Sequence, residues 1–176
     1  MVFRPGSNLS SLLSDSAPVT AATAESHARQ IQEKLGETWL PRIYRDRILR
    51  LRTRSYHFET ANPKARIVIQ HTLLGVELKI GRRRLLCPDL ATARYLSVFA
   101  RIGVSDVAVP YDITKISHIA DELDSSWYRM LLMVEQEAGK ESPKVQRRVR
   151  GLLIAEVRTE IEAAGAGTKM PEFKKK

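Results

Sequence analysis

The 176-residue chain has one cysteine, few aromatic residues (6%) and no long apolar run. One cysteine cannot form an internal disulfide, and the apolar neighbours of Cys87 indicate a buried thiol. A reducing, cytoplasmic location is therefore expected. Because spanning a bilayer takes roughly 18 to 20 apolar residues, no membrane association is expected.

The motifs of several enzyme classes are also missing. The chain has no Gly-rich phosphate loop and no G-x-S-x-G sequence, and its four histidines lack metal-ligand spacing. These histidines are His27, His57, His71 and His118. Nucleotide-dependent chemistry, serine hydrolase chemistry and a histidine metal site are thus not indicated, and no cofactor is expected.

Charge is abundant and unevenly distributed. The chain has 29 Lys and Arg against 20 Asp and Glu, a formal net charge of +9. Residues 42–86 hold twelve basic and three acidic residues, whereas residues 106–138 hold seven acidic and two basic ones. The sequence therefore predicts a basic half and an acidic half.

The length suits one domain with a hydrophobic core. We expect a flexible N-terminal tail at residues 1–23, a single α+β domain at 24–164 and a basic flexible tail at 165–176.

The predicted fold is centred on residues 48–86. Apolar and polar residues alternate there with the period of two that a half-buried strand shows, and Gly81 allows a tight turn. These features predict a β-meander. A short strand near residues 106–109 completes a small, mostly antiparallel sheet packed by three to four helices.

Helix stripes and capping residues predict four helices. The first spans residues 24–35 with Thr23 as N-cap, and the second follows the cap Asp89 and ends at Gly103. The third runs from Asp112 to residue 138, and the last begins near Pro143 and ends near residue 164. Residues 42–47 fit either a helical turn or the start of the first strand.

The candidate functional surface is the polar face of the first predicted strand. Alternate residues recur about every 7 Å on one strand face, close to the phosphate spacing of an extended nucleic acid. Aromatic rings on that face can stack on bases. The residues are Arg50, Arg52, Arg54, Tyr56 and Phe58, with Arg66 and Lys79 on neighbouring strands. The alternative is that the arginines pair with the chain's own acids, namely Asp121, Glu122, Asp124 or Glu135.

Two further basic clusters carry the same ambiguity. Arg82, Arg83 and Arg84 lie at a predicted hairpin turn, where they either grip phosphates or increase solubility. The first turns of the last helix are also basic, an arrangement that opposes the helix dipole unless an anion or nearby glutamates compensate it. That cluster is Lys144, Arg147, Arg148 and Arg150, and the nearby acids are Glu135, Glu137 and Glu141.

Glu77 and Lys79 form an E-x-K sequence on the third predicted strand. With the order helix, three antiparallel strands, helix, strand, this sequence resembles the core of the PD-(D/E)xK nuclease superfamily. The resemblance implies that Glu77 binds Mg²⁺ and that Lys79 steadies the charge at the attacked phosphate. The motif is incomplete, because residues 64–72 lack the acid that the superfamily has at its second strand.

We therefore expect a non-catalytic protein that binds the phosphate backbone of DNA or RNA through arginine side chains. One alternative is a divalent-metal-dependent nuclease that uses Glu77 and Lys79. The other is a protein-interaction module whose charged halves meet an acidic protein or a second copy of the chain.

Overall fold

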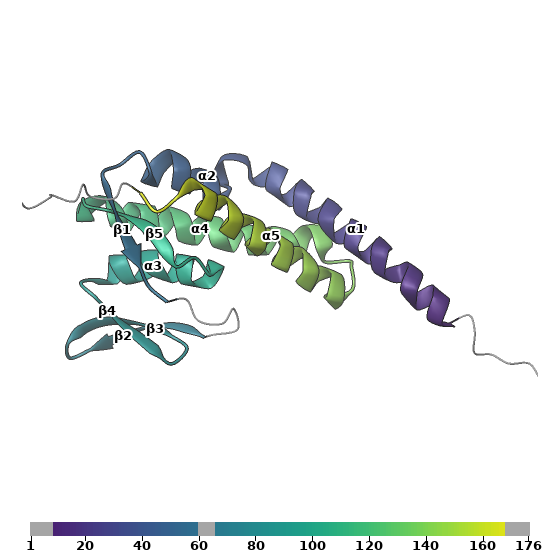
Figure 1. Cartoon of the computed structure of the whole chain (residues 1–176), viewed down its shortest axis with the longest axis horizontal. Coiled ribbons are helices and arrows are strands. Elements are labelled where there is room, and N and C mark those ends of the chain that lie inside the picture. Colours follow the sequence, from purple (N-terminus) through teal and green to yellow (C-terminus); the bar gives the residue numbers. More distant parts are fainter. Residues whose placement is uncertain (1–8, 60–65, 168–176) are drawn as a thin grey trace, which may run out of the picture. The chain divides into compact units, whose positions relative to one another are not determined.

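The computed structural model describes residues 9–59 and 66–167 and confirms an α+β fold (Figure 1). The helices are α1 (Leu9–Leu35), α2 (Leu40–Ile43), α3 (Leu90–Ile102), α4 (Ile113–Ala138) and α5 (Pro143–Ala164), with a 3-10 turn at Gly36–Thr38 and a π-helical turn at Tyr44–Ile48. The strands are β1 (Thr53–His57), β2 (Ile67–Thr72), β3 (Gly75–Ile80), β4 (Arg83–Cys87) and β5 (Asp106–Pro110).

These elements form two compact units. The first contains the described residues 9–36 and 130–153, and the second contains 37–59, 66–129 and 154–167. The helices α4 and α5 contribute residues to both units.

In the first unit, α1 is longer than predicted. It begins at Leu9, so residues 9–23, expected to lie in a tail, continue the helix. Thr23 does not cap its start, because the Thr23 hydroxyl donates to the carbonyl of Val19 at 2.8 Å, one turn earlier in the same helix. Residues 1–8 and 168–176 of the predicted tails lie outside the described residues.

Two side-chain contacts join α1 to the residues where α4 ends and α5 begins. Nε2 of His27 lies 3.2 Å from a carboxylate oxygen of Glu141, and Lys34 pairs with Glu137. Ile31 and Leu35, one turn apart on α1, are buried as their predicted apolar stripe requires.

The second unit holds two antiparallel sheets. The predicted meander is confirmed for β2, β3 and β4, in that spatial order. The first predicted strand does not join it, because β1 pairs with β5 from Thr53 opposite Pro110 to His57 opposite Asp106. Residues 48–86 therefore contribute to two sheets, which corrects the predicted single sheet.

Burial within the meander follows the predicted alternation. Val76, Leu78 and Ile80 of β3 are buried, whereas Glu77 and Lys79 between them are partly exposed. The helix α3 contacts β2, β3 and β4. Hence one face of the meander packs in the core, and the other, which we call the outer sheet face, carries Glu77 and Lys79.

Several predicted helix ends are confirmed. The Asp89 carboxylate accepts from the backbone N–H of Thr92 at 2.7 Å and caps α3, and Gly103 ends that helix in the left-handed conformation with φ 92°. Pro143 begins α5, where a missing N–H leaves no bond unmade.

Candidate nucleic-acid interface

The three arginines at the start of the candidate surface do not share one strand. We call Arg50, Arg52 and Arg54 the arginine row. Arg54 lies on β1, but Arg50 and Arg52 precede it. The strand begins late because residues 49–51 are held in a turn, with the N–H of Leu51 bonded to the carbonyl of Ile48 at 3.0 Å. Of the two alternatives for residues 42–47, the helical one is confirmed.

All three side chains of the arginine row are exposed. Within residues 9–59 and 66–167, none of them forms an ion pair with a carboxylate. The Arg52 guanidinium lies over the ring of Tyr111, 5.3 Å from its centroid, a cation–π contact that leaves the positive charge in place. The row is therefore positive and accessible.

Three of the four acids named as alternative partners of the row pair with other residues. Glu122 pairs with Arg47 at 2.9 Å. Arg94 bridges Asp121 and Asp124 at 2.7 and 2.9 Å, and these bonds raise the pKa of the Arg94 guanidinium. Acidic residues of α4 therefore do form ion pairs with arginines, but the arginines are Arg47 and Arg94 and not those of the row.

The two aromatic residues of the candidate surface differ in exposure. Tyr56 is half-buried and lines a small hollow with Arg54 and Leu86. Phe58 is only 6% exposed, and its ring centroid lies 6.1 Å from that of Tyr56. Phe58 thus supports Tyr56 from the core and presents no free face to a base, which corrects its predicted stacking role.

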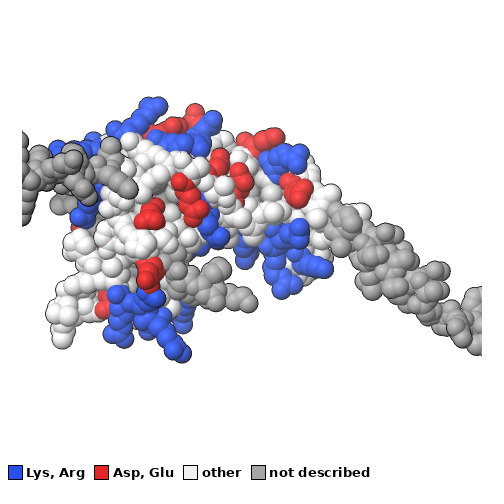
Figure 2. Space-filling model, viewed as in Figure 1, with Lys and Arg blue, Asp and Glu red and all other residues white. Residues whose placement is uncertain are grey.

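The outer sheet face adds a second group of cations. Lys79 lies in register between Val68 and Arg84. Arg66 and Lys79 line a hollow of about 250 Å³ together with Val68, Gln70 and Gly81. Figure 2 shows Lys and Arg side chains gathered over the meander. These positions bring Arg66, Lys79 and Arg84 onto one accessible face.

The hairpin cluster is divided. Arg82 is exposed at the β3–β4 turn. Arg83, on the strand after the turn, pairs with Glu59. Nε of Arg84 lies 3.4 Å from a Glu77 oxygen. Arg82 is therefore unpaired in the described part of the chain, whereas the charges of Arg83 and Arg84 are partly neutralised.

The E-x-K residues are side by side on the outer sheet face, as the sequence predicts. Glu77 faces the cation Arg84, and no set of three or more His, Cys, Asp or Glu side chains arranged to hold a metal occurs among the described residues. The nuclease reading of Glu77 and Lys79 stays a prediction.

Sequence reasoning missed Tyr111. It lies just past β5, and its backbone N–H donates to the carbonyl of Arg52 at 3.0 Å while its ring supports the Arg52 guanidinium. No local pattern marks this role, because the contact depends on β1 pairing with a strand about fifty residues away.

The chain matches no protein-family model, no curated protein and no solved structure. Among the described helices, none combines the length and the hydropathy that crossing a membrane requires.

Proposed function

We propose that this chain is a non-catalytic nucleic-acid-associated protein that binds phosphate backbones through the second unit. The contact residues are Arg50, Arg52, Arg54, Arg66, Lys79, Arg82 and Arg84, with Tyr56 beside them. The observation that supports the proposal is the arginine row, which is exposed and makes no internal ion pair among the described residues. A buried, free Cys87 is compatible with the reducing cytoplasm that we expect as its location.

Arginine suits this task for a physical reason. Its planar guanidinium stays charged and presents several N–H donors that match phosphate oxygens. Such contacts fix the position of a nucleic acid without reading its sequence. We therefore expect similar binding to unrelated sequences of single-stranded DNA or RNA, with Tyr56 adding a stacking contact.

The test is a fluorescence-anisotropy titration of labelled oligonucleotides over a range of salt concentrations. Each phosphate contact releases counterions, so the binding constant should fall steeply as salt rises. An affinity that is independent of salt would contradict the proposal.

A pair of variants localises the contact. Arg50→Gln with Arg54→Gln removes two charges of the row and leaves Arg52 on Tyr111; it should reduce the salt slope by about 1.4 to 1.8. Arg29→Gln with Arg129→Gln is the matched control, because both arginines are exposed on helices. Equal slopes in the two double variants would remove the row from the interface.

A pull-down with the full chain tests the interaction-module alternative. If nucleic acid is the partner, treating the captured complexes with nuclease should release whatever was recovered with the chain. Recovery of one stable acidic protein, or of a second copy of the chain, would contradict the proposed function and favour an interaction module.

A further inference from the structure

The exposed side of α5 in the first unit carries charge that the proposed interface does not use. Lys144 lies three and four residues before Arg147 and Arg148, and Gly151 lies four and three residues after them, so the four residues share one face of the helix. All four are exposed. We call these residues the α5 face, and Figure 2 shows a cluster of basic side chains along this half of α5.

The face contradicts local helix preferences at Lys144, which lies in the first turn of α5, and at Gly151. Cations near a helix N-terminus oppose the helix dipole, and glycine is the poorest helix former after proline. A Cβ built on Gly151 would meet no atom within 4 Å, so no close packing in the described structure requires a glycine there. Residues that lower helix stability without improving packing inside the protein are expected at functional positions.

Nearby carboxylates do not compensate the charges. Two of the three glutamates expected to do so have partners on α1, since Glu137 pairs with Lys34 and Glu141 with His27. The third, Glu135, is exposed, and no ion pair joins it to α5 within the described residues. No ion pair joins Lys144, Arg147 or Arg148 to a carboxylate in residues 9–59 and 66–167, so these cations are available to an external anion.

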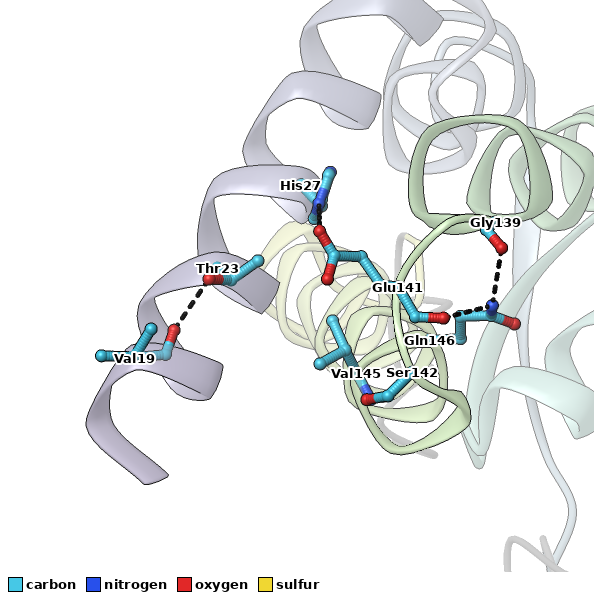
Figure 3. Close-up of polar contacts among 8 residues, drawn as sticks. All are labelled: Val19, Thr23, His27, Gly139, Glu141, Ser142, Val145 and Gln146. Carbon is cyan, nitrogen blue, oxygen red and sulfur yellow. Dashed lines mark hydrogen bonds and ion pairs between the residues drawn. The ribbon is translucent and has the colours of Figure 1, made fainter. Parts of the chain in front are cut away.

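The turn before α5 is held in place. Glu141 reaches toward His27 on α1, as Figure 3 shows. The side-chain amide of Gln146 donates to the carbonyls of Gly139 and Glu141 at 3.3 and 3.0 Å. The hydroxyl of Ser142 accepts from the N–H of Val145 at 3.4 Å. These contacts orient the start of α5 and hold Glu141 to α1.

We propose that the α5 face is a second contact for the phosphate backbone of the same nucleic acid, an inference that rests on the proposed function. Its three cations lie on two successive turns of the helix, ~5.4 Å apart along the axis, a spacing that lets them contact neighbouring phosphates. The face has no aromatic or large apolar residue, the kind that anchors protein partners and membrane-surface helices. Gly151 lets a phosphate come close to the helix backbone.

The experiment compares two oligonucleotide lengths with the full chain. A single-stranded probe of about 40 nucleotides can engage two surfaces, whereas one of about 10 nucleotides is close to the size of a single site. Arg147→Gln with Arg148→Gln should weaken binding of the long probe roughly ten-fold or more at ~0.1 M salt and reduce its salt slope by about 1.4. Its effect on the short probe should be smaller.

The control and the row variant separate the outcomes. If the α5 double variant behaves like Arg29→Gln with Arg129→Gln while the row variant loses affinity, the inference is wrong and the proposed function stands. If neither differs from the control, both are wrong. A loss of affinity in the α5 double variant alone would support the α5 face as a phosphate contact and would exclude the arginine row from the interface.

Gly151→Ala tests the close approach separately. Alanine should raise the Tm by about 2 to 4 °C, because it is the better helix former. Binding of the long probe should weaken at least three-fold if a phosphate lies against the backbone. A higher Tm with unchanged affinity would show that Gly151 has no part in the contact.

Discussion

The hydroxyl of Tyr95 donates to the backbone carbonyl of Ala108 at 2.5 Å in the core of the second unit. The backbone N–H of Ala108 donates to the hydroxyl of Tyr44 at 3.2 Å. Ser55 and Ala108 form a non-hydrogen-bonded pair of the antiparallel ladder, so the N–H and the carbonyl of Ala108 point away from β1. The two tyrosines satisfy these two backbone groups. Side chains thus take the place of a third strand, and β5 stays in a two-stranded sheet.

This contact predicts the effect of Tyr95→Phe. The change leaves the buried carbonyl of Ala108 without its donor, so the free energy of unfolding should fall by about 1 to 3 kcal/mol. Urea denaturation followed by circular dichroism measures it. Tyr128→Phe, at a residue that is 59% exposed, is the control. Equal unfolding midpoints for the two variants would show that the Tyr95 hydroxyl contributes nothing.

Cys87 predicts a dependence of stability on pH. Burial, followed by the charge of Asp89, raises the pKa of the Cys87 thiol from 9.0 to about 11. Because the folded pKa exceeds the unfolded one, this contribution is complete below pH 9 and is lost as the pH rises toward about 11.

The measurement compares wild type with Cys87→Ala. Other groups titrate in both proteins, so the difference between their free energies of unfolding isolates the thiol. Between pH 8 and pH 11 the wild type should lose on the order of 2 kcal/mol more than the variant. Parallel stability curves over this range would contradict the assignment.

Glu77 is expected to weaken phosphate binding by the outer sheet face. It is the acid nearest to Arg84 there, at 3.4 Å, so Glu77→Gln should make nucleic-acid binding about two- to five-fold tighter at low salt. Glu156→Gln, an equal change of charge at an exposed position of α5, is the control. Anisotropy titrations measure the affinity.

The same variant distinguishes the nuclease interpretation. A nuclease that binds Mg²⁺ through Glu77 would cleave nucleic acid with Mg²⁺ or Mn²⁺, and Glu77→Gln would abolish the cleavage. Intact DNA and RNA after long incubation of the wild type with either ion, together with tighter binding by the variant, would favour the non-catalytic proposal.

Local patterns in the sequence were enough to predict the meander and most helix ends. The alternation at Val76, Leu78 and Ile80 and the cap at Asp89 depend on residues that are neighbours along the chain. The start of α1 was predicted too late, because its Ser-, Thr- and Ala-rich first half has no clear apolar stripe.

By itself, the sequence determined the α+β class, the burial of Cys87 and the excess of basic over acidic residues, since periodicity and composition carry that information. Only the tertiary structure decided that β1 pairs with β5, that Phe58 is buried and that Arg94, not the arginine row, meets Asp121 and Asp124. The physical reason is that strand pairing and charge compensation join residues far apart in the chain, and such partners leave no trace in a local pattern.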